Sequence, residues 1–152
     1  MSQAQTPLLA SHALVGLPYV PGRFTCAHLA VLAQERLFGR QVAAQLPQRH
    51  AVGAAAEREM LLRWRDELAD PLPDGQAPQD GDAALFVQGW EHDEVWHVGT
   101  VLLGPYGDPW VLHTHAGAGH SVVERPATMR RRGLRLEGYY RWRVASLGEG
   151  RA

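Results

Sequence analysis

The sequence predicts an α+β fold in which N-terminal helices pack on an antiparallel sheet of about 4–5 strands. Two observations indicate this class. Apolar residues in the first half of the chain recur at helical spacing, whereas those in the second half form short runs separated by turn-forming residues. Because these short runs follow one another closely, they are typical of an antiparallel meander, not of parallel crossovers.

The first long helix is predicted over residues 26–38. Thr25 can cap its N-terminus, and Gly39 stands where a left-handed C-terminal residue is favoured. This segment is apolar nearly all round, so we expect the helix to be mostly buried. Residues 1–13 are compatible with either a short helix or a loop.

A second helix is predicted over about residues 54–69, ending before Pro71. Glu59 and Arg63 can pair one turn apart on it. One of its faces is apolar and carries Met60, Leu61, Trp64 and Leu68. A loop over 70–82 then leads into the predicted strands, which cover about 83–88, 95–104, 109–115, 120–124 and 136–144.

Length and composition limit the function. The 152 residues are typical of one domain spanning 1–152, and 45% of them are hydrophobic. A net charge of -1 argues against nucleic-acid binding by the whole chain. We expect no signal peptide and no membrane insertion, because the N-terminus lacks a basic flank and no apolar run reaches the length of a span. The single cysteine excludes an intramolecular disulfide.

That cysteine, Cys26, is a candidate nucleophile. It opens the predicted helix over 26–38, where free backbone N–H groups and the helix dipole favour a negative charge on sulfur. From position alone, a cysteine that simply packs in the core is an equally good interpretation. A nucleophilic role requires a base from another part of the chain.

His97 is the candidate base, because it lies in the most apolar predicted strand. His113 and His115 are candidates for the group that orients it, and strand alternation places both on one face. Either can approach His97 only if odd-numbered residues of the two strands pair with odd-numbered residues. The Pro-containing turn between the strands leaves this register open.

Six segments, in this order, resemble those of the NlpC-type cell-wall peptidases, particularly the versions associated with phage tail tips. The first precedes the nucleophile, the second carries it, and the third leads into the first core strand. The others carry the base, the third polar residue and the last strand. They are Gly16–Tyr19, Cys26 with the helix ending at Phe38-Gly39, Gln79–Phe86, His97–Gly99, Val111–His113 and Glu137–Arg141.

The resemblance implies a papain-like fold and a cysteine hydrolase that cleaves amide bonds in the peptide stems of peptidoglycan. Cys26 would be the nucleophile, His97 the base and His113 the residue that orients it, with His115 as the substitute. Tyr19 would add a hydroxyl near the oxyanion. No cofactor is expected, and the partners would be peptidoglycan and tail-tip or hub proteins. The location would be the virion tail tip, or the host cytoplasm before assembly.

The chain departs from the family beside the nucleophile. Thr25 stands where an aspartate is usual, and Ala27-His28 replaces a small or aromatic residue followed by glycine. A structural hub or plug of a tail-like machine, with little or no activity, is therefore the alternative function. A related acyltransferase or deamidase is a third.

Metal binding is a further alternative for Cys26 and the histidines at positions 92, 97, 113, 115 and 120. The chain lacks the paired ligand spacings of a structural zinc site, although His113 and His115 form a strand-compatible pair that a catalytic metal could use. The basic stretch is interpreted as a solvated face; it comprises Arg130, Arg131, Arg132, Arg135, Arg141 and Arg143.

Overall fold

The computed structural model describes residues 5–42, 53–89 and 94–143. Its helices are α1 (Pro7–Ala10), the 3-10 helix η1 (Ser11–Leu14), α2 (Cys26–Phe38), α3 (Ala54–Leu68) and α4 (Pro126–Arg131). Its strands are β1 (Ala69–Pro71), β2 (Ala83–Gln88), β3 (Val95–Leu103), β4 (Pro109–His113), β5 (Val122–Glu124) and β6 (Arg135–Trp142). None of the helices in these ranges has the length and apolar character needed to cross a bilayer.

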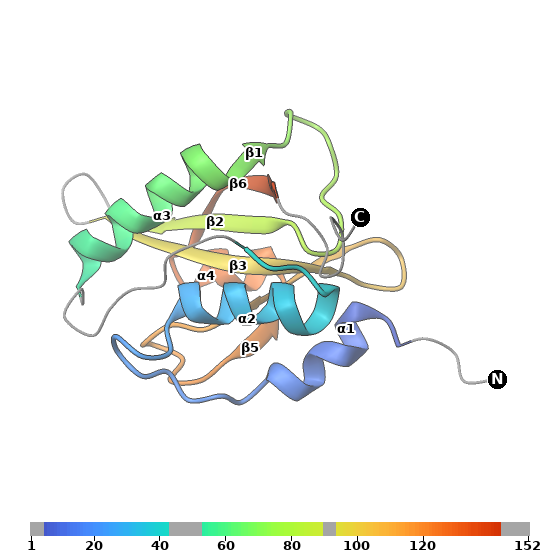
Figure 1. The fold of residues 1–152 in the computed structure, drawn as a ribbon, viewed down its shortest axis with the longest axis horizontal. Coiled ribbons are helices and arrows are strands. Elements are labelled where there is room, and N and C mark those ends of the chain that lie inside the picture. The colour runs from blue at the N-terminus through green and yellow to red at the C-terminus, as the bar shows by residue number, and fades with distance from the viewer. Residues whose placement is uncertain (1–4, 43–52, 90–93, 144–152) are drawn as a thin grey trace, which may run out of the picture.

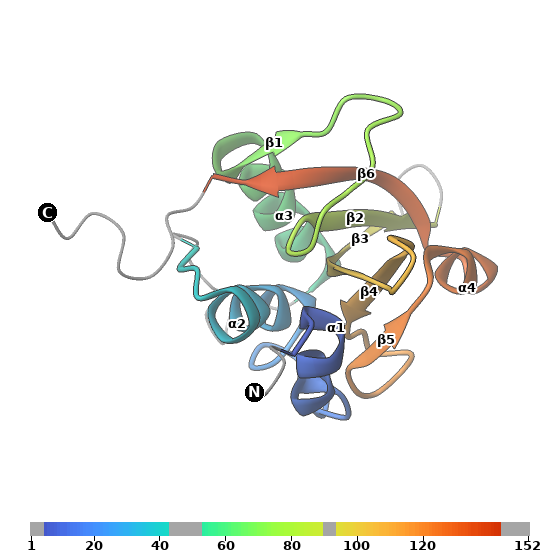
Figure 2. The same ribbon diagram turned by 90° about the vertical axis from the view of Figure 1, so that its right-hand side faces the viewer.

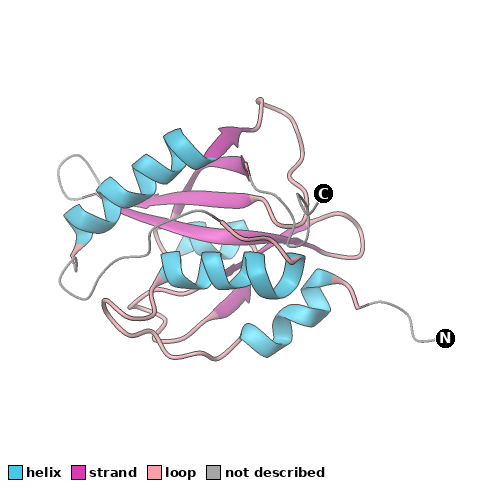
Figure 3. Cartoon of the chain, in the orientation of Figure 1, coloured by secondary structure: helices cyan, strands magenta, loops and turns pink. Residues whose placement is uncertain are grey.

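The described strands form one sheet in the order β1-β6-β2-β3-β4-β5, and every neighbouring pair is antiparallel. Helices α2 and α3 lie on one face of this sheet and α4 lies on the other (Figures 1 and 2). Figure 3 shows the helices lying against the sheet, and the colours of Figure 1 show that the helices come mainly from the first half of the chain and the strands from the second. The predicted α+β class is therefore confirmed.

Three details of the predicted topology are wrong. The sheet has six strands among the described residues, because β1 pairs with β6 at one edge. The strands are not a simple meander, since β6 returns to lie between β1 and β2. Helix α4 was not predicted. Its six residues are too few for a periodic pattern, and only Pro126 at its first turn marks its start.

Helix α2 matches its predicted bounds. Gly39 adopts the left-handed conformation at its C-terminus, with φ of 60°, and its N–H bonds back to the helix. Small and apolar side chains bury the helix against the sheet, as expected from its composition. This packing fixes the position of the helix start, and therefore of Cys26, relative to β3.

Helix α3 covers the same sheet face with its predicted apolar stripe. Leu61 and Trp64 are buried there, with Met60 and Leu68 packed against them. On the exposed side, Glu59 and Arg63 form the expected ion pair at 3.6 Å. Such an exposed pair contributes little to stability, so the apolar stripe is what holds α3 in place.

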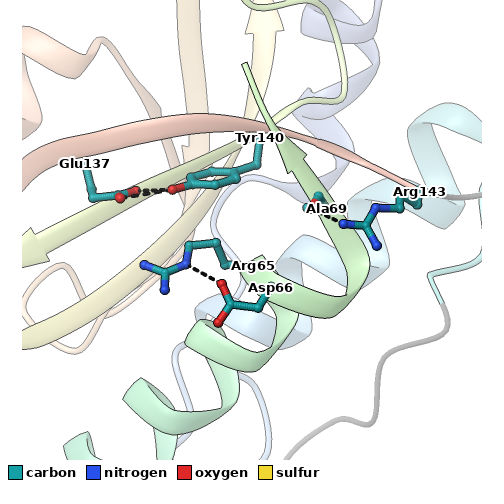
Figure 4. A network of polar contacts seen from close by, with 6 residues as sticks. All are labelled: Arg65, Asp66, Ala69, Glu137, Tyr140 and Arg143. Carbon is teal, nitrogen blue, oxygen red and sulfur yellow. Dashed lines mark hydrogen bonds and ion pairs between the residues drawn. The ribbon is translucent and has the colours of Figure 1, made fainter. Parts of the chain in front are cut away.

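Polar contacts fasten the last turn of α3 and the edge strand β1 to β6 (Figure 4). Arg143 donates a hydrogen bond to Asp70. It donates another to the carbonyl oxygen of Ala69, which Figure 4 shows. On β6 the Tyr140 hydroxyl bonds to the Glu137 carboxylate at 2.7 Å. The Arg143 contacts tie a strand of only three residues to the end of β6, whereas the Tyr140–Glu137 bond lies within β6 itself.

The loop before β2 is held by two buried or partly buried carboxylates. Asp82 accepts two hydrogen bonds from Arg141 and one from the backbone N–H of Gln79. Asp80 accepts one from the backbone N–H of Leu103 on β3. These hydrogen bonds hold the segment before β2 against the end of the sheet at which β3 finishes. This is the end remote from the start of β3.

Candidate active site

Two histidines on neighbouring strands form the centre of the site. Odd-numbered residues of β3 pair with odd-numbered residues of β4, as Val101 with Val111, so the register condition set by the sequence is met. Nε2 of His97 lies 2.9 Å from Nδ1 of His113, which is a short hydrogen bond between buried rings.

The hydrogen-bonded chain continues beyond His113. Its Nε2 lies 2.9 Å from Oε2 of Glu124, the last residue of β5. The other carboxylate oxygen of Glu124 forms an ion pair with Arg132, at the C-terminus of α4. The His113 side chain is 0% exposed and that of Glu124 is 17% exposed, so the chain runs from the interior toward the surface.

Burial keeps both rings neutral. It lowers the pKa of His97 well below its usual value, and the charges of His113 and His115 lower it further. Burial also lowers the pKa of His113 to about 3, with additional effects from His115 and Arg132. The Glu124 carboxylate alone would favour a charged His113, but the Arg132 guanidinium neutralises it.

His115 contacts the pair through its ring alone. It lies in the turn after β4, stacked on His113 at 5.5 Å between ring centroids and edge-on to His97 at 5.7 Å. Its Nε2 is buried without a hydrogen-bond partner in the described part of the chain. Of the two candidates for orienting His97, His113 is the one that hydrogen-bonds to it.

Cys26 begins α2 as predicted, but its expected low pKa is wrong. The residue is only 6% exposed and belongs to the buried apolar cluster that includes Val98 and Leu85. Burial raises the pKa of the thiol to about 12, and the charge of Glu57 adds to this shift. Backbone hydrogen bonding from Val98, Ala27 and Cys26 itself favours the thiolate, but it does not outweigh burial.

Cys26 and His97 approach β3 from different sides. Val98 packs with Cys26 on the face covered by α2, whereas His97 is paired with Phe86, whose side chain packs with Met129 of α4. Alternation along β3 separates the two faces. In the described residues no hydrogen bond joins the thiol to His97, and the two side chains lie toward opposite faces of the sheet.

Two further groups lie near the thiol. The pKa of the Tyr19 hydroxyl is raised to about 12 by burial and by the charges of Glu57 and Cys26, which places these three side chains in one neighbourhood. The backbone N–H of Tyr19 donates to the carbonyl oxygen of Gly119, which anchors its loop. Glu57, in the first turn of α3, was missed because its helix is remote from Cys26 in the sequence.

Thr25 and His28 form the N-terminal cap of α2. The backbone N–H of Thr25 donates to Nδ1 of His28 at 3.1 Å, and its hydroxyl oxygen lies 2.9 Å from the same nitrogen. His28 therefore takes the place that a glutamate or glutamine has in a capping box. Since Nδ1 accepts a backbone proton, the ring carries its own proton on Nε2, and burial lowers its pKa.

No group of three or more His, Cys, Asp or Glu side chains within residues 5–42, 53–89 and 94–143 is arranged to hold a metal ion. His92, one of the histidines considered for zinc, lies outside these ranges. His120 is exposed, and its backbone bridges to Pro18. Most of the arginine-rich stretch is exposed as expected, but Arg132, Arg141 and Arg143 form ion pairs with Glu124, Asp82 and Asp70.

Glu124 and Arg132 are site residues that the sequence did not identify. Glu124 was placed at the end of a predicted strand, but its approach to His113 depends on the β4–β5 register, in which Val111 pairs with Glu124. Arg132 lay in a stretch interpreted as solvated, and α4, which positions it, was not predicted.

Comparisons of the chain with models of known families, with curated proteins and with solved structures found no match. What the protein does must therefore be inferred from its own residues and their geometry.

Proposed function

We propose that the chain is a cysteine hydrolase that cleaves amide bonds in the peptide stems of peptidoglycan. One observation carries the proposal. His97 is bonded to His113 through Nε2, so Nδ1 is its remaining nitrogen and has no hydrogen-bond partner among the described residues. The backbone of Val98, the residue that follows His97 on β3, lies beside the Cys26 sulfur. The first feature is that of an oriented base, and the second brings the thiol to the neighbouring residue of the same strand. Attack also requires the sulfur and Nδ1 of His97 to come within hydrogen-bond reach, so the proposal includes a rearrangement at the start of β3 when substrate binds.

The start of α2 supports the same role for Cys26. Backbone hydrogen bonding at the sulfur comes from the first residues of the helix and from Val98. Donors of this kind stabilise negative charge that develops during attack, on sulfur or on the carbonyl oxygen of a substrate. The backbone N–H of Cys26 is the candidate oxyanion donor, and the Tyr19 hydroxyl is a second.

In the proposed reaction the Cys26 sulfur attacks the amide carbonyl carbon, and Nδ1 of His97 takes the thiol proton. Collapse of the tetrahedral intermediate breaks the C–N bond, while His97 returns that proton to the leaving amine. The acyl thioester is then attacked by water. His97 accepts a proton from this water and gives it to the departing sulfur, releasing the free thiol and a carboxylic acid, which loses its proton to solvent.

The resting pair is neutral. With the thiol pKa near 12 and the His97 pKa well below its usual value, the thiol keeps its proton at neutral pH. Proton transfer therefore accompanies attack on the substrate instead of preceding it. A bound substrate that separates the thiol from its apolar packing is part of this proposal.

The substrate class comes from the resemblance to the NlpC-type peptidases, whose six segments recur here in order. Within that resemblance the architecture is papain-like, and the enzyme would be delivered to the cell wall as a component of a phage tail tip. The antiparallel sheet, with Cys26 opening a buried helix against it, is compatible with this assignment.

The test is digestion of purified peptidoglycan, with released fragments identified by mass spectrometry. Wild type should release fragments with new amine and carboxylate ends, and Cys26→Ala and His97→Ala should not. His120→Ala is the matched control, because His120 is exposed and makes no side-chain bond among the described residues. Release by Cys26→Ala equal to that of wild type would remove Cys26 from its role.

A structural hub or plug of a tail-like machine is the second candidate function. The observation that favours it is the buried, protonated thiol, which makes no hydrogen bond to His97 in the described residues. This candidate predicts that wild type releases no fragments and that Cys26→Ala assembles into the tail as wild type does. Digestion and assembly assays on the same variants separate the two.

A further inference from the structure

We propose that Glu124, held by Arg132, is a positioning residue. It determines which ring nitrogen carries the proton in His113 and in His97, and so leaves Nδ1 of His97 unprotonated. The order of protons in the pair is a property of the folded protein. Its consequence for catalysis rests on the proposed function.

The first step is the bond between Glu124 and His113. The carboxylate of Glu124 is ion-paired with the Arg132 guanidinium, so it is ionised and can only accept hydrogen bonds. Its Oε2 lies 2.9 Å from Nε2 of His113. The proton in this contact must therefore come from His113, and Nε2 of that ring carries it.

The second step follows from the neutrality of the buried rings. A neutral imidazole has one N–H, so a proton on Nε2 of His113 leaves a lone pair on its Nδ1. That lone pair lies 2.9 Å from Nε2 of His97, which must donate to it. Nδ1 of His97 is then unprotonated and can act as a base.

No other described ring beside the pair forms a hydrogen bond that would favour a different placement of the protons. His115 stacks on His113 face to face, and its own Nε2 has no partner among the described residues. Phe86, the other ring beside His97, has no polar atom. Without the Glu124 carboxylate, the hydrogen bond between the rings could equally run the other way, with Nδ1 of His113 donating to Nε2 of His97. It would leave Nδ1 of His97 already protonated and unable to take the thiol proton.

The test is proton-detected NMR of protein labelled with nitrogen-15 in histidine, in which the nitrogen shifts show which ring nitrogen carries the proton. In wild type we expect both His97 and His113 to be protonated on Nε2 alone. Glu124→Ala should move both rings to a mixture of the two forms, and Glu124→Asp should recover the wild-type form in part. Glu59→Ala is the matched control, since Glu59 is exposed on α3.

Arg132→Gln provides a second readout with a milder change. Because Glu124 then loses its compensating cation, His113 should take up a proton at higher pH than in wild type, seen as a shift of its titration. Two results would overturn the proposal: a wild-type His113 protonated on Nδ1, or a Glu124→Ala spectrum identical to that of wild type. If Glu124→Ala does not fold, the wild-type spectrum and the Arg132→Gln titration test the proposal in its place.

The kinetic consequence separates this proposal from the proposed function. If wild type hydrolyses peptidoglycan, Glu124→Ala should lower kcat roughly ten- to a hundredfold with little change in KM, because the base would be in the wrong form for part of the time. If wild type shows the predicted proton order but releases no fragments, the positioning role of Glu124 stands and the hydrolase proposal fails.

Discussion

The two halves of the candidate site are both buried, but they are held in opposite ways. Under α4, the histidine pair is linked by hydrogen bonds from His97 through His113 to Glu124. At the start of α2, Cys26 lies among apolar side chains. A buried imidazole needs hydrogen-bond partners, and His113 has one on each ring nitrogen, whereas a buried thiol behaves as a small hydrophobe. The histidine half is therefore ordered without help from the thiol half.

Removing Cys26, His97 or both tests whether the halves nevertheless act together, and it has the largest expected effect. Each single alanine variant should lose roughly 10⁴-fold or more in peptidoglycan cleavage, because thiol and base act in one step. The double variant should lose no more than either single variant. Losses that multiply in the double variant, measured as initial rates of fragment release, would show that the halves act independently.

Thiol reactivity tests the apolar character of the α2 end. At neutral pH the thiolate fraction of a thiol with a pKa near 12 is roughly a thousandfold below that of a thiol with the ordinary value of 9.0. Alkylation of folded wild type by iodoacetamide should therefore be slow and should rise with pH well above 9. The urea-unfolded chain is the reference. Equal rates for the folded and unfolded chains at pH 7.5 would contradict a buried neutral thiol.

His113 tests the connected half by a matched pair of substitutions. His113→Ala removes the acceptor for Nε2 of His97, so cleavage should fall roughly a hundredfold or more. His113→Asn keeps an acceptor oxygen near the position of Nδ1 and should retain more activity than the alanine variant. Equal rates for the two variants would indicate that the bond to His97 has no role in the reaction.

The pH dependence of stability tests whether His113 is neutral when folded. Its folded pKa is about 3 and its ordinary value is 6.5, so between these limits the unfolded chain binds a proton that the folded chain does not. Stability should therefore fall as pH decreases through this window, by about 1.4 kcal/mol per pH unit for this residue. Urea unfolding at several pH values should give a flatter profile for His113→Asn, and parallel profiles would contradict the assignment.

The smallest expected effect concerns the cap that places Cys26 at the start of α2. Thr25→Ala should lower the free energy of unfolding by about 1 kcal/mol, because Thr25 is buried and caps a helix of 13 residues. Thr6→Ala, at the exposed cap of the four-residue α1, should cost less. Urea denaturation compares the two, and a larger loss for Thr6→Ala would show that the α2 cap is not what stabilises this end.

The sequence predicted what depends on local pattern. Helix α2 and strand β2 have their expected bounds, because capping residues, turn formers and apolar spacing lie within one short window of the chain. From the sequence, the approach of His113 to His97 depended on one unknown, the register between their two strands. Strand alternation alone does not determine that register. The structure answers it through the β3–β4 pairing.

What the sequence did not predict depends on long-range placement. The edge position of β1, the return of β6 and the approach of Glu124 and Arg132 require pairings between distant segments. The thiol pKa was wrong for a related reason. A helix N-terminus can be read from sequence, whereas the burial and the charge of Glu57 that oppose it depend on how other elements pack around the thiol.

The most direct test of the central claim is to look for the acyl group on sulfur. Wild type mixed with muropeptides from purified peptidoglycan, quenched in acid and analysed as intact protein, should show a mass increase that tryptic mapping places on Cys26. The adduct should be absent from Cys26→Ala and much reduced in His97→Ala. Fragment release without any adduct on Cys26, or an adduct that persists in Cys26→Ala, would contradict a reaction in which the sulfur and His97 cooperate.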